Sequence, residues 1–161
     1  MSLSSSAHRR SDFNRDDPNY ERRPYDRRES YGQSKTCSAL FVVGLTRSFS
    51  DEGIFSNAVM PGGILTNPQR HMSIEDQRQA GFIDEGANPN PLFKCPAQGA
   101  STSVWAALAP ELEAVGGLYL ENCAQAGLMD HAQPFMGYMP YALDPGSADV
   151  LWQLSEERTR A

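Results

Sequence analysis

Cysteine and long hydrophobic runs are both scarce in this sequence. The three cysteines, Cys37, Cys95 and Cys123, are odd in number and widely spaced, so they indicate neither a disulfide framework nor a zinc site. The longest apolar run, ALFVVGL, is too short to cross a bilayer, and the first residues, MSLSSSAHRR, lack the apolar core of a signal peptide. We therefore expect a cytoplasmic protein with no membrane span and no bound metal.

Lysine and histidine are scarce as well, because two lysines and three histidines accompany twelve arginines. His8, His71 and His131 lie in polar or loop segments without metal-ligand spacing, which predicts surface histidines. Residues 1–35 hold eight basic and six acidic side chains, which leaves six basic and fourteen acidic ones for the rest of the chain. An acidic body argues against a nucleic-acid groove, and the interleaved charges near the start predict a solvated segment.

Hydrophobic spacing predicts one α/β domain in which helices alternate with strands. Helices are predicted near residues 30–50, 96–109 and 144–158, and strands near residues 54–59 and 117–121. Gly53 and Pro96 are predicted to end the first helix and to begin the second. Residues 64–94 are rich in proline, glycine and asparagine, which predicts an irregular lid or insertion with a short helical patch. A strand after a helix predicts a parallel sheet.

One of the two lysines, Lys35, follows Tyr31 by four residues in the stretch SYGQSKTCSALF. On a helix this spacing places both side chains on one face, about 6 Å apart at the backbone. A phenol has an unperturbed pKa of about 10, and a nearby ammonium lowers that pKa because it favours the phenolate. The pair is typical of a proton-transfer centre, although so short a motif also occurs by chance.

The order of the elements that follow makes the motif more specific. An apolar helix, a strand and a Pro-Gly turn with a threonine close behind come after the pair, in YGQSKTCSALFVVGLTRSFSDEGIFSNAVMPGGILTN. This stretch resembles the short-chain dehydrogenase/reductase (SDR) family from its active-site helix to its nicotinamide loop. Three further stretches are similar to the branch of this family that includes retinol dehydrogenases and WW-domain-containing oxidoreductases. They are SSSAHRRSDF, DPNYERRPYD and NPNPLFKCPAQGASTSVWAALAPELEAVGGLYLE. The resemblance covers almost the whole chain.

The resemblance implies three catalytic residues. Tyr31 matches the catalytic tyrosine, and Lys35 matches the lysine that also holds the ribose hydroxyls of the cofactor. Ser5 best matches the serine that hydrogen-bonds the reacting oxygen, with Ser4 or Ser6 in that role if the register is off by one. The implied reaction is hydride transfer between NAD or NADP and a small-molecule alcohol or carbonyl substrate, without a metal.

The resemblance also implies a cofactor-binding loop after the strand. The matching residues, besides Lys35, are Pro61, Gly62, Ile64 and Thr66. Without the tyrosine and lysine upstream, the same loop would be interpreted as a simple strand-ending turn. Apolar side chains within the irregular residues 72–93 and 128–139 either pack beneath these loops or line a substrate pocket, and such a pocket would suit an apolar alcohol or ketone.

The family's glycine-rich turn, which packs the cofactor pyrophosphate against a helix amino terminus, is missing from this sequence. The sequence therefore predicts the carboxy-terminal half of an SDR domain: a partial Rossmann-like doubly wound parallel sheet that is inactive alone. Its expected parts are the end of the serine strand with an irregular segment (1–29), the active-site helix, strand and nicotinamide loop (30–63), a substrate-lid region (64–94), and the terminal helices with the last strand (95–161).

The main alternative is a non-catalytic interaction or dimerisation module built from the same helices. Both hypotheses predict the same fold, and both allow self-association or a complementing amino-terminal half as the partner. A nucleic-acid binder with a basic arm is a third interpretation, which depends on the arginine pairs alone and which the acidic body opposes.

Overall fold

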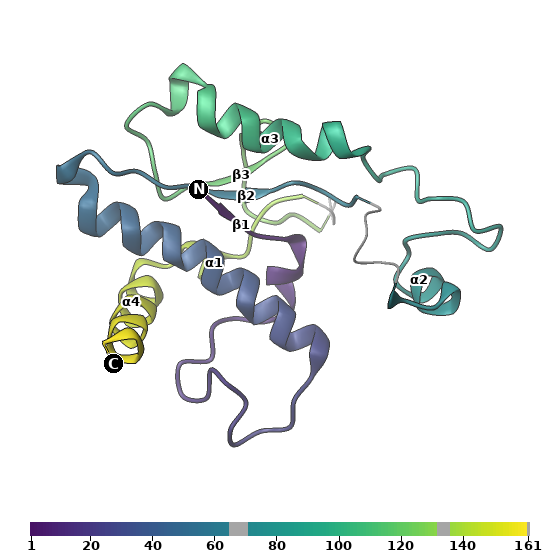
Figure 1. The fold of residues 1–161 in the computed structure, drawn as a ribbon, viewed down its shortest axis with the longest axis horizontal. Coiled ribbons are helices and arrows are strands. Elements are labelled where there is room, and N and C mark those ends of the chain that lie inside the picture. The colour runs from purple at the N-terminus through teal and green to yellow at the C-terminus, as the bar shows by residue number, and fades with distance from the viewer. Residues whose placement is uncertain (65–70, 132–135, 161) are drawn as a thin grey trace.

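The computed structural model describes residues 1–64, 71–131 and 136–160. Its centre is a four-stranded sheet in the order β1-β2-β3-β4, with helices on both faces (Figure 1). The strands are β1 (Ser2–Leu3), β2 (Ala58–Met60), β3 (Tyr119–Glu121) and β4 (Ala124–Gln125). The first three strands are parallel, and β4 is antiparallel to β3. The partial Rossmann-like α/β arrangement predicted from the sequence is confirmed.

The helices form one layer on each side of this sheet (Figure 1). One layer holds α1 (Arg27–Phe49) and α4 (Pro145–Thr159), the other holds α3 (Pro96–Leu108), and α2 (Ile74–Gln79) stands apart from both. Short 3-10 helices are η1 (Ser6–Arg10), η2 (Ser50–Glu52), η4 (Pro110–Leu112) and η5 (Pro140–Leu143). The three predicted long helices are therefore confirmed. No helix of the described residues is long and apolar enough to span a membrane.

α1 begins and ends where local chemistry favours it. Asp26 caps its amino end by accepting the Glu29 N–H at 2.7 Å. Gly53, at φ 78°, adopts the left-handed conformation that ends the helical path after η2, as predicted. Pro96 likewise occupies the first position of α3, where its missing N–H costs nothing.

Two groups of buried side chains hold α1 in place. Toward the sheet, Ala39 and Val42 pack with residues of β2 and β3, including Tyr119. Toward α4, Leu40 packs with Ala148 in a second cluster. The position of α1 is therefore fixed from two sides by burial, which is the dominant favourable contribution to folding.

The strand predicted at residues 54–59 is displaced, because β2 begins only at Ala58. The Thr46 hydroxyl accepts the Ser56 N–H at 3.0 Å and donates to the Ser56 carbonyl at 3.1 Å. The Ser56 carbonyl also accepts the Gly117 N–H at 2.7 Å, so this backbone bonds both to α1 and to the segment before β3. The predicted start of the strand was wrong because the Ile54 N–H bonds the Phe49 carbonyl of α1 and the Ile54 side chain is exposed.

β4 has no counterpart among the predicted elements. Asn122 and Cys123 adopt left-handed φ angles of 51° and 55°, the geometry of a two-residue hairpin turn between β3 and β4. Cysteine is not typical of such turns, but the Cys123 N–H donates to the buried Thr102 hydroxyl of α3 at 3.2 Å. The turn therefore depends on a helix from elsewhere in the chain, which local patterns do not reveal.

Candidate active site

The segments that leave the three parallel strands meet at one edge of the sheet. β1 leads into Ser4 and Ser5, β2 leads into Pro61 and Gly62, and β3 leads into Asn122. In parallel α/β sheets the carboxyl ends of the strands form the usual ligand-binding edge. The structure thus places the predicted serine and most of the predicted cofactor loop at the edge where a ligand would bind.

α1 places Tyr31 and Lys35 at the end of β1. The Lys35 Nζ lies 5.6 Å from the centroid of the Tyr31 ring and donates a 3.1 Å hydrogen bond to the Leu3 carbonyl. The Tyr31 side chain is 49% exposed, so its phenol stays accessible to a substrate. The lysine is thus tied to the strand that leads into the serines.

Of the three candidate serines, Ser5 is best suited to donate to a ligand. The Ser4 side chain is buried and donates its proton to the Lys35 carbonyl at 2.9 Å. Ser5 caps η1, where its Oγ accepts the Ala7 N–H at 3.2 Å. Accepting that bond leaves the Ser5 hydroxyl proton available, and among the described residues it has no acceptor. Ser6 is exposed at the start of η1.

The loop after β2 turns sharply at Gly62. Its φ of 102° is a conformation that residues with a Cβ rarely adopt, and its N–H donates to the Met60 Sδ at 3.0 Å. Ile64 pairs with Lys94 in a parallel bridge, so the loop lies beside the start of α3. Thr66 lies outside the described residues, and its role stays a prediction.

Lys94 closes over this loop, although the sequence reasoning gave it no role. Its Nζ donates to the Pro61 carbonyl at 3.2 Å and to the Asn122 Oδ1 at 2.6 Å. A Cβ built on Gly62 would lie 3.0 Å from the Lys94 Cδ, so the side chain packs directly on the bare backbone. Lys94 therefore joins the ends of β2 and β3. Its rarity as one of two lysines was a signal, but a lone lysine matches no pattern.

His8 is fully buried, so its predicted place on the surface was wrong. Its Nδ1 lies 2.7 Å from the Ser5 carbonyl and 3.1 Å from the Tyr119 hydroxyl, and its Nε2 accepts the Met139 N–H at 3.2 Å. Burial lowers the pKa of His8 below its usual 6.5, with the Ser5 bond opposing this change and the Arg9 charge reinforcing it. The prediction failed because the polar sequence around His8 does not reveal partners more than one hundred residues away. His71 and His131 are exposed.

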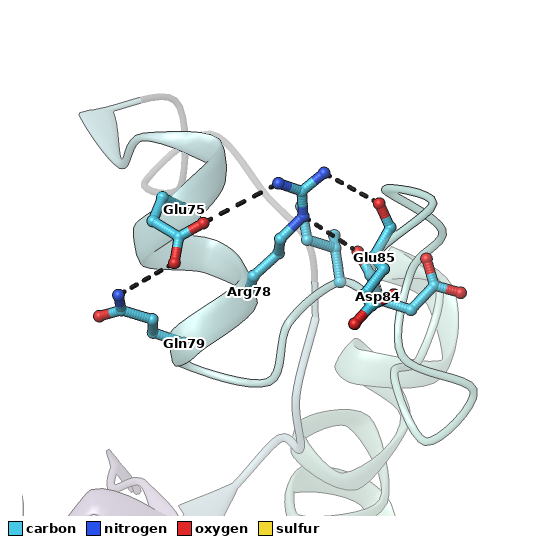
Figure 2. A pocket seen from close by; sticks show the side chains of 6 residues that line it. Glu75, Arg78, Gln79, Asp84 and Glu85 are labelled. Atoms are coloured by element: carbon cyan, nitrogen blue, oxygen red, sulfur yellow. Dashed lines mark hydrogen bonds and ion pairs between the residues drawn. The ribbon is translucent and has the colours of Figure 1, made fainter.

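A hollow of ≈ 790 Å³ lies beside α2 (Figure 2). Arg78 crosses it and donates to the carbonyls of Asp84 at 3.4 Å and Glu85 at 2.9 Å, while its guanidinium lies 3.9 Å from the Glu75 carboxylate. Arg78 is therefore held by one carboxylate and two backbone carbonyls, and the hollow is lined mainly by charged and polar side chains. Such a lining does not suit an apolar substrate, and α2 stands away from α1, which carries the predicted tyrosine and lysine (Figure 1).

The residues present fit one end of a nicotinamide cofactor. The loop after β2 lies at the carboxyl edge of the sheet with Lys94 packed on Gly62, and Lys35 at the end of β1 offers an ammonium donor suited to ribose hydroxyls. No stretch of the sequence forms the glycine-rich turn that would hold a pyrophosphate. Among the described residues, no group of three histidine, cysteine or acidic side chains is arranged to hold a metal ion.

Known proteins match this chain along nearly its whole length. A Streptomyces lividans protein named probable oxidoreductase is 42% identical over 163 residues, covering 99% of this chain and 54% of that protein. Short-chain dehydrogenase/reductase prx1 of Penicillium rubens is 33% identical, covering 96% of this chain and 45% of that protein. Retinol dehydrogenase 14 of Homo sapiens is 32% identical, covering 96% of this chain and 42% of that protein. The chain belongs to the SDR family.

The chain spans about half the length of these curated relatives. No protein-family model matches it. A crystal structure of an uncharacterized protein from Mycobacterium paratuberculosis has a similar fold, with a TM-score of 0.61 and 23% identity over 99% of this chain and 49% of that one. At that identity the likeness supports the fold alone. The similarity to the branch with retinol dehydrogenases and WW-domain-containing oxidoreductases is also confirmed.

Proposed function

We propose that this chain supplies the proton-transfer half of an SDR oxidoreductase that interconverts an alcohol and a carbonyl compound. The observation that carries the proposal is the Tyr31–Lys35 pair, which is partly exposed on α1 and anchored by Lys35 to the end of β1. Ser5, whose hydroxyl proton is available, follows that strand directly. Neighbouring segments therefore carry the proposed general acid-base, Tyr31, the ammonium beside it, Lys35, and the proposed donor to the substrate oxygen, Ser5.

In the proposed mechanism, bound NAD or NADP supplies the hydride acceptor or donor. The Tyr31 hydroxyl gives a proton to the substrate oxygen during reduction and its phenolate takes that proton back during oxidation. The Lys35 ammonium, 5.6 Å from the centroid of the Tyr31 ring, is the proposed electrostatic partner of the phenolate. The Ser5 hydroxyl donates to the substrate oxygen as negative charge develops there.

The proposed site for the nicotinamide carboxamide is the loop of Pro61, Gly62, Ile64 and Thr66. Lys35 is the proposed donor to the ribose hydroxyls. The place of this loop at the carboxyl end of β2 supports the proposal, and the Lys94 side chain that packs on Gly62 would have to move aside for a ligand to reach that backbone. The pyrophosphate site has to come from a second polypeptide segment, because this sequence lacks the glycine-rich turn. The chain alone is therefore expected to be inactive.

We propose that a complementing amino-terminal half pairs with β1. Within the described part of the chain, β1 pairs only with β2, so its outer edge is open. Leu3 on β1 and Phe41 on α1 are large exposed apolar side chains. Parallel strands are normally covered on both sides, and an open edge invites pairing with another chain. A second copy of this chain is the alternative occupant of that edge.

An apolar alcohol or carbonyl compound is the proposed substrate class. Leu128 and Met136 are exposed apolar side chains in the segment after β4. Tyr138 anchors that segment, because its ring stacks on Tyr119 at 5.9 Å and its N–H bonds the Gly127 carbonyl at 3.0 Å. A segment with apolar side chains beside a few polar groups is typical of small-molecule sites.

The test is complementation. The chain is coexpressed with the part of the Streptomyces lividans relative that it does not match, and turnover of apolar alcohols is followed by nicotinamide absorbance. Tyr31→Phe should lower kcat about 10²–10⁴-fold while leaving cofactor affinity nearly unchanged, because only the proton route is lost. Lys35→Ala should reduce both. Tyr25→Phe, which changes an exposed tyrosine of the preceding segment, is the matched control.

Equal turnover of Tyr31→Phe and the unsubstituted complex would contradict the proposed role. Absence of turnover and of cofactor binding in every complemented form would favour the non-catalytic interaction module. For the chain alone, a sharp unfolding transition in a monomer together with micromolar cofactor binding would overturn the need for a second half.

A further inference from the structure

His8 sits where three parts of the chain meet. It belongs to η1, directly after the serine turn, and it bonds the Tyr119 hydroxyl of β3 and the Met139 N–H just before η5. Its own carbonyl accepts from the Thr36 hydroxyl of α1 at 3.1 Å and from the Tyr141 hydroxyl of η5 at 2.9 Å. None of these contacts is used in the proposed proton transfer, yet they link the serine turn, α1 and the segment of residues 137–143.

The partners of His8 fix its protonation state. The Ser5 carbonyl can only accept, so the Nδ1 at 2.7 Å must carry a hydrogen. The Met139 N–H can only donate, so the Nε2 at 3.2 Å must be bare. His8 is therefore the neutral Nδ1–H tautomer, because the imidazolium or the other tautomer would point a hydrogen at the Met139 N–H.

The same reasoning gives a direction to the hydrogen bonds that lead from His8 to α1. Because Nδ1 carries a hydrogen, which it shares between the Ser5 carbonyl and Tyr119, the Tyr119 oxygen is an acceptor toward His8. On the other side, the Thr36 hydroxyl of α1 donates to the His8 carbonyl. The Met139 amide and α1 therefore both donate to His8, one to its Nε2 and the other to its carbonyl oxygen.

Other ionisable groups surround His8. Arg9 lies on its own turn and donates to the Gly137 carbonyl at 3.0 Å, and Glu121 of β3 accepts the Gly137 N–H at 2.6 Å. Tyr119 and Tyr141 contribute phenols, and burial raises the pKa of Tyr119 to about 12, so it stays neutral. α1 contributes the Thr36 hydroxyl and the Lys35 carbonyl, which do not titrate. His8 is thus the group of this set expected to change charge in mildly acidic solution.

We propose that His8 is a positioning residue that couples residues 137–143, at the mouth of the substrate site, to the α1 helix that carries Tyr31 and Lys35, and that it does so only as the neutral Nδ1–H tautomer. Its protonation replaces the Met139 bond by a repulsive contact and releases that segment. The coupling is a property of the fold, whereas its effect on turnover rests on the proposed function.

The test follows hydrogen exchange of the Met139 amide in the chain of residues 1–161 as the pH is lowered. After correction for intrinsic exchange, protection of this amide should fall about tenfold for each pH unit once the unfolded or opened form binds one proton more than the closed form. The Ala58 amide, which bonds the Leu118 carbonyl at 2.8 Å inside the sheet, is the internal reference. As the pH is lowered, protection of the Met139 amide should fall more steeply than protection of the Ala58 amide.

Two variants separate positioning from simple packing. His8→Gln keeps an acceptor toward the Met139 N–H but does not titrate, so Met139 protection relative to Ala58 should become independent of pH. His71→Gln, at an exposed histidine, should leave the titration as in the unsubstituted chain.

Protection of Met139 that does not change with pH in the unsubstituted chain would overturn the proposal without any variant. So would an unchanged titration of Met139 protection in His8→Gln. These readouts need no turnover, so they stand whether or not Tyr31 proves catalytic. In the complemented enzyme, His8→Gln should raise KM more than it lowers kcat, because the substrate-mouth segment is displaced and the proton route is kept.

Discussion

The α1 side of the sheet and the segment of residues 71–94 are held in different ways. α1 buries one whole face against the sheet and α4, whereas α2 has no buried residue. α2 is stabilised instead by the capping box of Ser73 and Asp76 and by the bonds of Arg78 to Asp84 and Glu85. In Figure 1, α2 stands apart on its own loops, while α1 lies along the sheet.

This difference suits two different proposed roles, because one region would hold a catalytic side chain in place and the other would cover a substrate. The proposed acid-base Tyr31 needs a fixed place, and the buried face of α1 provides it. Residues 64–94 were predicted to be a substrate lid, a role that would require movement, and elements with few buried contacts open at low free-energy cost. Lys94 marks the border between the two, because it ties the loop after β2 to the end of β3 while residues 71–93 extend beyond it.

The largest expected effect comes from the buried face of α1. Leu40→Ala removes a fully buried side chain, and the lost burial with the remaining cavity should lower the free energy of unfolding by about 2–5 kcal/mol. Ile74→Ala in α2, at a side chain that is 55% exposed, should change it by less than about 0.5 kcal/mol. Urea denaturation followed by circular dichroism measures both. Similar losses in the two variants would erase the distinction between the regions.

A smaller effect is expected where α1 touches the serine turn. Gly32→Ala would place a methyl group 2.8 Å from the Ala7 carbonyl oxygen, a backbone atom that cannot rotate away. We expect a loss of about 1–3 kcal/mol, because this strain outweighs the better helix propensity of alanine. Gly146→Ala in α4, with only an ordinary contact at 3.4 Å, is the matched control and should be neutral or stabilising. If Gly32→Ala instead raised the free energy of unfolding in urea denaturation, η1 would have to shift enough to accommodate the added methyl group.

The buried α1 side should also be the more sensitive region to mild acid. The folded pKa of His8 lies below its unfolded value of 6.5, so its contribution is fully present above that pH. As the pH falls below 6.5 the unfolded chain binds the proton first, and stability should decrease by up to about 1.4 kcal/mol per pH unit until the folded pKa is reached. Urea midpoints at several pH values measure this slope, and His8→Gln should flatten it.

The carboxylates behave in the same direction but at lower pH. Hydrogen bonds with the Ser147 backbone and side chain hold the pKa of Asp144 below its usual 3.8, and bonds from Asn88 do the same for Asp84. Their contributions are present above about pH 4 and are lost only as the pH falls through the folded values. A loss of stability that begins only in this lower range would contradict the role given to His8.

The smallest contrast lies between two helix caps. Asp144 accepts the Ser147 N–H at 2.7 Å and caps α4, which packs on α1, so Asp144→Ala should cost about 1 kcal/mol of global stability. Ser73 caps α2 in an equivalent way, but Ser73→Ala should lower only local hydrogen-exchange protection in residues 74–79, because that helix opens independently. An equal global loss in thermal denaturation would mean that α2 unfolds together with the sheet.

The sequence alone determined the features that depend on neighbours along the chain. Periodic apolar residues specified the three long helices, Gly53 ended the first of these and Pro96 began the second. The four-residue spacing of Tyr31 and Lys35 was enough to place both on the same side of α1, because helix geometry fixes it. The order of these elements also specified the family.

The tertiary structure decided what depends on segments that are distant in sequence. Thr46 of α1 bonds the backbone before β2, Thr102 of α3 bonds the β3–β4 turn, and the ends of β2 and β3 hold Lys94. His8 became a buried centre only because Met139, 131 residues later, returns to bond it. A buried polar group needs a partner, and no local pattern states where along the chain that partner will be found.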